Sequence, residues 1–99
     1  MAASAASAPF RISSKTLFLT FPNLNPDIDL ATEARRVLDF FSSHGIDYGC
    51  ISKELHESGR PHIHLFVYLQ RPFNTRRITC FDKLLSQEQH PNIVSRIRS

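Results

Sequence analysis

The sequence predicts an α+β fold, with one central antiparallel sheet and flanking helices. Residues 15–22 and 62–70 each separate into two distinct rows of side chains at the two-residue period of a strand. Residues 29–43 instead repeat their apolar side chains at the period of a helix. A connector containing Gly and Pro joins residues 48–55 to residues 62–70, which is typical of a hairpin. Strand, helix and hairpin together favour a sheet with helices on one face.

The first elements follow from local composition. Residues 1–10 are rich in Ala and Ser with little to bury, so we expect a disordered tail there and a single folded domain over residues 11–99. Residues 15–22 carry apolar side chains on both faces, which predicts an interior strand. Asp29 is expected to cap a helix that runs to about Ser43. Its buried stripe is expected to comprise Leu30, Ala34, Val37, Leu38 and Phe41, and Gly45 stands where a C-terminal cap would lie.

The C-terminal third is basic and less regular. We expect residues 71–79 to form an exposed basic connection, and residues 80–85 fit either a short strand or a helical turn. A last strand is expected over residues 92–97. The net charge of +3 is concentrated in this third, which favours a polyanionic partner, with nucleic acid the first candidate. Arg76 and Arg77 are candidate phosphate contacts.

Other classes of protein are disfavoured by the sequence. No apolar run approaches the ~20 residues that cross a bilayer, so no membrane association is expected. The chain shows no secretory signal, which predicts an intracellular protein. Cys50 and Cys80 match no zinc-ligand spacing by themselves and are expected to be free thiols.

The stretch from His62 to Gln70 carries the chemistry. Its odd-numbered side chains are aliphatic and suit a core, whereas His62, His64, Phe66 and Tyr68 share the other face. Residues two apart on a strand lie roughly 6.5–7 Å apart, so both imidazoles can reach one ion.

A carboxylate joins the two imidazoles if the hairpin pairs as we expect. A register with Glu54 opposite His62 also sets Ser52 against His64 and Cys50 against Phe66. It places Glu54, His62 and His64 on one face, a donor set that suits a divalent cation with open positions. A one-residue slip would destroy the cluster.

Three segments then resemble one family, the replication-initiator proteins of geminiviruses and related circular single-stranded DNA viruses. Phe18-Leu19-Thr20-Phe21-Pro22 looks like the family's first motif, usually written FLTYP. Residues 54–64 are similar to the segment that ends in the histidine-hydrophobic-histidine motif of HUH endonucleases. Phe81-Asp82 and His90-Pro91-Asn92-Ile93 look like parts of an element that lies between the family's second and third motifs. The resemblance extends over residues 11–94.

The resemblance implies an HUH endonuclease fold of ferredoxin or RNA-recognition type. It implies that Glu54, His62 and His64 hold Mg²⁺ or Mn²⁺, and that the domain binds and nicks origin single-stranded DNA for rolling-circle replication in the host nucleus. Nicking in this family leaves a phosphotyrosine link. The residues expected to contact DNA are Phe18, Thr20, Phe21, Pro22, Arg76 and Arg77.

Two departures from the family pattern bear on activity. Phe21 stands where the first motif usually has tyrosine. The third motif, with its nucleophilic tyrosine, is absent, so we expect a domain incomplete at its C-terminus that does not nick alone and oligomerises only in a longer product. Tyr68 lies roughly 13 Å from His64 along a strand, and Tyr48 lies at the same end of the hairpin. We expect both tyrosines to pack on the sheet.

Two alternatives remain open. The domain could be a non-catalytic module that binds single-stranded nucleic acid by stacking bases on Phe66 and Tyr68. A structural zinc site formed by Cys50, His62 and His64 is a third hypothesis.

Overall fold

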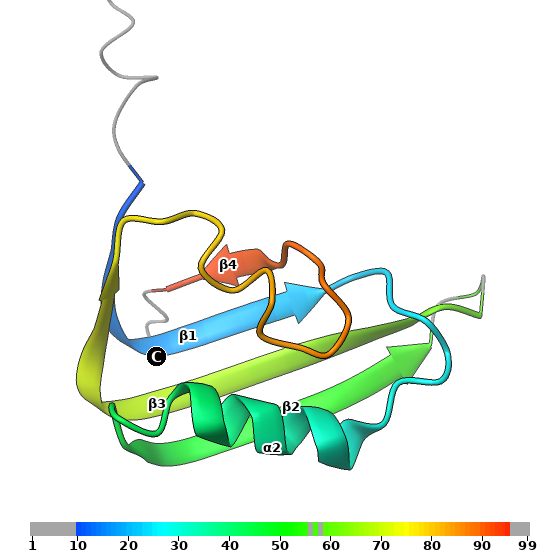
Figure 1. Cartoon of the computed structure of the whole chain (residues 1–99), viewed down its shortest axis with the longest axis horizontal. Helices are drawn as coiled ribbons and strands as arrows, with labels where there is room; N and C mark the ends of the chain where they lie inside the picture. Colours follow the sequence, from blue (N-terminus) through cyan, green and yellow to red (C-terminus); the bar gives the residue numbers. More distant parts are fainter. Residues whose placement is uncertain (1–9, 56, 58, 96–99) are drawn as a thin grey trace, which may run out of the picture.

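Four antiparallel strands form one sheet in the computed structural model, which describes residues 10–55, 57 and 59–95. The strands lie in the order β2-β3-β1-β4, and one helix, α2, connects β1 to β2 (Figure 1). The elements are β1 (Ile12–Phe21), α2 (Leu30–Phe40), β2 (Ile46–Leu55), β3 (Pro61–Thr75) and β4 (Asn92–Val94). The predicted α+β class is confirmed, and β1 is an interior strand as expected.

The strand order is that of a ferredoxin-like sheet, in which the first and third strands are central and the last lies beside the first. That topology usually places a second helix before its last strand. Here residues 76–91 form turns and bends instead. They include residues 80–85, where hydrogen-bonded turns followed by bends exclude the strand alternative and agree with the turn alternative.

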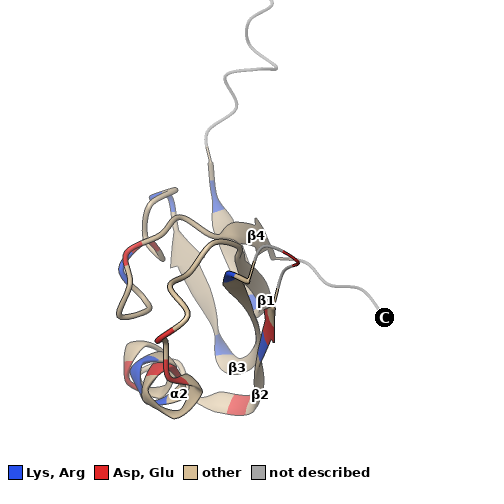
Figure 2. Cartoon of the chain, turned by 90° about the vertical axis from the view of Figure 1, so that its right-hand side faces the viewer, with Lys and Arg blue, Asp and Glu red and all other residues tan. Residues whose placement is uncertain are grey.

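One face of the sheet is aliphatic and lies under α2 and the turns of residues 76–91 (Figures 1 and 2). Burying a Leu or Phe side chain stabilises a fold by about 1.5–3 kcal/mol, so this face supplies most of the folding free energy. The side chains of the two central strands that are at most 2% exposed are Ile12, Leu17, Leu19, Phe21, Ile63, Leu65, Val67 and Leu69.

Helix α2 begins where the sequence predicted. The Asp29 carboxylate accepts a hydrogen bond from Thr32 N at 3.0 Å, which satisfies one of the free N–H groups of the first turn. The helix ends at Phe40, and a further turn leads to Gly45 at φ +72°, the left-handed conformation that suits glycine. The expected end at Ser43 was therefore three residues too long.

The expected buried stripe of α2 was correct at Val37 and Phe41 and wrong at Leu38. Leu38 is 57% exposed, whereas Glu33 is only 1% exposed. Glu33 tolerates burial because its carboxylate accepts hydrogen bonds from Ser86 N at 2.8 Å and Ser86 Oγ at 2.6 Å. The helix is thus turned toward a polar anchor that helical periodicity does not reveal.

The C-terminal expectations were partly wrong. Strand β3 continues to Thr75 instead of giving way to an exposed connection, because Phe73 is buried against Phe41 and Phe81 at ring-centroid distances of 5.6 and 5.3 Å. The last strand is present but short, and residues 96–97 of its expected span lie outside the described residues. Phe10, expected in the tail, packs against the core, and residues 1–9 lie outside the described residues.

No helix or strand of the described residues covers the opposite face of the sheet, which we call the open face (Figure 2). Tyr48, Tyr68 and Val94 are 58%, 45% and 49% exposed there. The strand register places four rows of side chains across it: Tyr48-Tyr68-Thr16, Cys50-Phe66-Phe18-Val94, Ser52-His64-Thr20-Asn92 and Glu54-His62. Among the described residues, no helix has the length and apolar character needed to cross a bilayer.

Candidate metal centre

The hairpin of β2 and β3 pairs in the register that the sequence predicted. Glu54 lies opposite His62, Ser52 opposite His64 and Cys50 opposite Phe66. Because side chains directly opposite each other share a face, this register puts the carboxylate and both imidazoles together on the open face.

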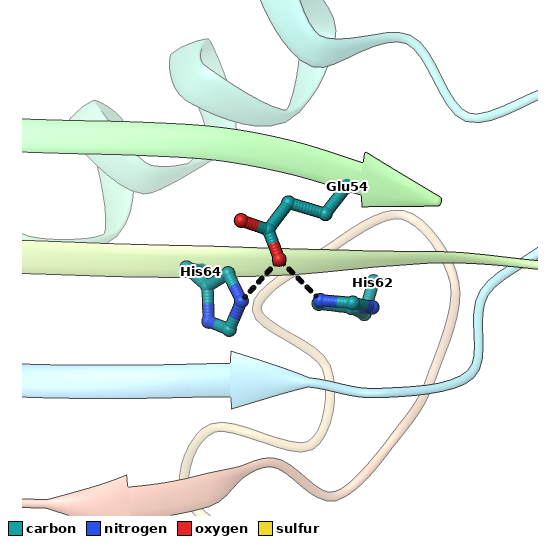
Figure 3. Close-up of side chains that lie close together, drawn as sticks. All are labelled: Glu54, His62 and His64. Atoms are coloured by element: carbon teal, nitrogen blue, oxygen red, sulfur yellow. Dashed lines mark hydrogen bonds and ion pairs between the residues drawn. The ribbon is translucent and has the colours of Figure 1, made fainter. Parts of the chain in front are cut away.

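The three side chains converge on one point (Figure 3). Glu54 Oε1 lies 2.8 Å from His62 Nε2 and 3.2 Å from His64 Nε2. The two imidazole rings are nearly perpendicular, at 84° with centroids 4.7 Å apart. One donor atom from each residue lies within 4.8 Å of the others, a spacing that one metal ion can bridge.

Strand β1 holds the His64 ring in place. Thr20, directly opposite His64, has its Oγ1 3.2 Å from His64 Nδ1. The Phe18 ring stacks on the His64 imidazole, with the ring centroids 5.7 Å apart and an interplanar angle of 6°. A hydrogen bond to Nδ1 fixes the ring so that Nε2 faces the ion site, as commonly occurs for metal-ligating histidines.

The carboxylate is held in its ionised form. Hydrogen bonds from His62 first, and His64 second, lower the pKa of the Glu54 carboxyl below its ordinary value of 4.5. An ionised carboxylate has only acceptors, so each Nε2 carries a proton in the arrangement described here. The Glu54 side chain is 61% exposed and those of His62 and His64 are 14% and 28% exposed, so the cluster opens to solvent on the carboxylate side.

This donor set fits a divalent cation. Two imidazole nitrogens and a carboxylate oxygen, with solvent on one side, leave positions for water or a ligand. Cys50 is not part of the cluster found among the described residues. It lies opposite Phe66, four residues before Glu54 along β2. The arrangement therefore does not bring together the Cys50, His62 and His64 set of the zinc hypothesis.

The residues expected to contact DNA separate into three groups. Phe18 and Thr20 lie on the open face beside the cluster, and Pro22 is exposed just after the end of β1. Phe21 is fully buried on the helix-covered face, so its side chain belongs to the core. The first motif usually has tyrosine at its fourth position. Phe21 replaces it here, at a position that solvent does not reach.

Arg76 and Arg77 are exposed but distant from the cluster. They follow Thr75, which pairs with Ile12 at one end of the β1–β3 ladder, whereas Ile63 pairs with Phe21 at the other end. The structure does not bring these arginines to the metal ligands.

The two tyrosines stand opposite each other on the open face and are exposed, so the expectation that they pack on the sheet was wrong in part. Tyr48 does contact Phe66, at 6.0 Å between ring centroids. Tyr68 is four strand residues from His64, which corresponds to roughly 13 Å.

The segment from Phe81 to Ile93 positions β4 beside the cluster. Phe81 is fully buried, and Asp82 Oδ1 lies 2.6 Å from His90 Nδ1. This pair closes the turn that leads to β4, where Asn92 lies opposite Thr20. Sequence reasoning missed both the Thr20–His64 contact and the Asp82–His90 pair, although the pairing of residues 12–21 with β3 could have revealed the first.

Comparison with known proteins identifies the family. Residues 10–99 match the family model described as the geminivirus Rep catalytic domain. The chain is 34% identical over 84 residues to the replication-associated protein A of Chloris striate mosaic virus, covering 85% of this chain and 27% of that protein. It is 33% identical over 88 residues to the replication-associated protein A of Tobacco yellow dwarf virus (strain Australia), covering 85% of this chain and 27% of that protein. The chain spans about a quarter of the length of these relatives. It belongs to the geminivirus Rep catalytic domain family.

Proposed function

We propose that this chain is the metal- and DNA-binding part of a replication initiator, whose open face binds origin single-stranded DNA over a divalent-cation site. The observation that carries the proposal is the convergence of Glu54, His62 and His64 on the uncovered face of the sheet. Family membership supports the same assignment, because the related proteins are named as replication-associated.

Membership of the Rep catalytic domain family favours Mg²⁺ or Mn²⁺ as the ion. When bound, it would polarise the scissile phosphate and offset negative charge as the phosphodiester is broken. Glu54 and both Nε2 atoms would hold it, and Thr20 and Phe18 would keep the His64 ring aligned.

Single-stranded DNA would lie across the remaining rows of the open face. Phe18, Phe66, Tyr48 and Tyr68 offer aromatic surfaces, and stacking one base on such a ring is worth about 1–3 kcal/mol. Pro22 lies at the edge of this surface, and Arg76 and Arg77 would contact phosphates only on DNA that continues past the far end of β3.

The nucleophile is the part of the nicking mechanism that this chain does not supply. Its sequence has two tyrosines, and both stand at the end of the hairpin away from the cluster. Productive attack requires reacting atoms about 3–3.5 Å apart. We therefore propose that this chain binds metal and DNA but forms no covalent adduct alone, and that the initiator acts in the host nucleus.

The metal site is tested by calorimetric titration of Mn²⁺ into the protein and the Glu54→Ala/His64→Ala variant. We expect one ion per chain and loss of binding in the variant. Glu57→Ala, which removes an exposed carboxylate from the same hairpin, is the matched control and should bind normally. Unchanged affinity in the double variant would show that the site is elsewhere.

A non-catalytic single-stranded nucleic-acid-binding module is the alternative, favoured by the exposed aromatic rows. The two functions differ in their need for metal. Under the alternative, oligonucleotide binding would be unaffected by EDTA and no Mn²⁺ would bind.

A further inference from the structure

We propose that Arg60 is a positioning residue for the metal site, because it holds the start of β3 against the loop of residues 23–25. This role rests on the metal site proposed above, although Arg60 is not itself a ligand. It accounts for how two of the three ligands keep fixed positions at an end of the sheet where only two strands pair.

The metal ligands stand where the sheet has lost one of its central strands. Strand β1 pairs with β3 only as far as Phe21 and Ile63, so His62 lies one residue beyond the last β1–β3 pair. Figure 3 shows His62 past the tip of β1. Glu54 and His62 form the last pair but one of the β2–β3 hairpin. A two-stranded ribbon is only marginally stable by itself, so these two ligands need support that β1 does not give.

The loop that follows β1 supplies this support. Leu24 is fully buried and anchors the loop in the core, and its backbone N–H donates to Pro61 O at 3.0 Å. Arg60 Nε and Nη2 donate to the side-chain oxygens of Asn23 and Asn25, at 2.5 and 3.4 Å. Because a guanidinium is a rigid planar fork, it binds both partners at once and fixes the backbone that leads into β3.

The same loop is held from its other side by the segment before β4. The Gln89 side chain accepts from Asn23 N at 2.9 Å and donates to Asn23 O at 2.6 Å. Gln87 Oε1 accepts from Asn25 N at 2.7 Å. We call these four residues the amide brace. The two glutamines bind the backbone of the loop, the two asparagines bind Arg60, and Arg60 thus connects the brace to the hairpin that carries the metal ligands.

The charge of Arg60 allows its role to be tested by the sign of an effect. Arg60 is a cation two residues from His62, so its charge alone opposes the binding of a second cation. If Arg60 acted only through charge, Arg60→Ala would tighten Mn²⁺ binding. If it positions Glu54 and His62, the same substitution weakens binding. Arg60→Lys keeps the charge and replaces the fork by a single ammonium, so it separates the two effects.

The experiment is calorimetric titration of Mn²⁺ into the protein and its variants. We expect about tenfold weaker binding in Arg60→Ala and about threefold weaker binding in Arg60→Lys, since losing a group that orients metal ligands lowers affinity. Gln89→Ala removes part of the amide brace without changing any charge and should also weaken binding, by about threefold. Arg71→Ala is the matched control. The Arg71 guanidinium likewise donates to a loop, at Ser43 O, but it lies toward the far end of β3, so affinity should be unchanged.

A second measurement requires no metal. In ¹⁵N relaxation of the metal-free protein, the backbone at Glu54 and His62 should become more mobile in Arg60→Ala than in the wild type. Gly49 and Val67, which pair toward the other end of the same hairpin, should keep their wild-type mobility. A residue that only stabilised the fold as a whole would not mobilise one end of the hairpin selectively.

The possible failures can be told apart. A wild-type protein that binds no Mn²⁺ would refute the metal site and the role of Arg60 together. Binding by the wild type that is equalled or exceeded by Arg60→Ala would refute the role of Arg60 alone. An equal loss in Arg71→Ala, or unchanged mobility at Glu54 and His62, would do the same. Weaker single-stranded DNA binding with unchanged Mn²⁺ affinity would assign Arg60 to a DNA phosphate and also refute positioning.

Discussion

The two faces of the sheet are built from alternate residues of the same strands, yet different requirements determine the side chains on each face. On the helix-covered face, Leu65 and Val67 are at most 2% exposed and packing determines which side chains are accepted. On the open face, His64 and Phe66 are half-buried and their contacts serve chemistry. The comparison shows that the strands can carry a polar site at little cost, because stability resides on the other face.

The largest expected effect is on the covered face. Phe41 is fully buried, and its ring packs against those of Phe40, Phe73 and Phe81. Phe41→Ala should lower the free energy of unfolding by about 3–5 kcal/mol, since it removes apolar burial and leaves a cavity. Denaturant unfolding followed by circular dichroism measures this, and a loss below about 1 kcal/mol would contradict the role given to this face.

The next largest effect on stability is expected at Glu33, the polar anchor of the covered face. Glu33→Ala leaves Ser86 N and Oγ without their acceptor and should cost about 1–3 kcal/mol. Glu33→Gln keeps one carbonyl acceptor and should cost less. An unchanged free energy of unfolding in Glu33→Ala would show that the hydrogen bonds to Ser86 contribute nothing to stability.

A substitution on the open face is expected to change metal binding and to leave the free energy of unfolding nearly unchanged. Thr20→Val preserves side-chain shape but removes the hydroxyl at 3.2 Å from His64 Nδ1. Mn²⁺ affinity should fall about tenfold, as is typical when the partner of a metal-ligating histidine is lost. Thr16→Val, on the same strand and face, is the control and should leave affinity unchanged in calorimetry. Equal affinities for Thr20→Val and wild type would remove Thr20 from the site.

The smallest effect concerns acid stability at the start of α2. The Thr32 hydroxyl and then the Thr32 N–H lower the pKa of Asp29 below its ordinary value of 3.8. A carboxyl with a lowered folded-state pKa adds stability that is present above 3.8 and lost as pH falls through the folded-state pKa. Thermal unfolding from pH 2 to pH 6 should therefore depend less on pH in Asp29→Asn, and identical slopes would contradict the cap.

The sequence was sufficient where one local rule acted alone. Two-residue alternation and the hairpin predicted the Glu54, His62 and His64 cluster, because any even register keeps all three on one face. The sequence was insufficient where contacts between segments far apart in the chain determine the structure. The burial of Glu33 depends on Ser86, the extension of β3 depends on Phe73 meeting Phe81, and the role of Thr20 depends on strand pairing across the sheet.

The most direct test of the account is a Mn²⁺ titration of ¹⁵N-labelled protein followed by NMR. Mn²⁺ broadens amide resonances near the ion. We expect broadening to be strongest at Glu54, His62, His64 and Thr20 and weakest near Thr75, at the opposite end of the β1–β3 ladder. Broadening centred on Asp27 and Asp29, or none at the open face, would contradict the metal site.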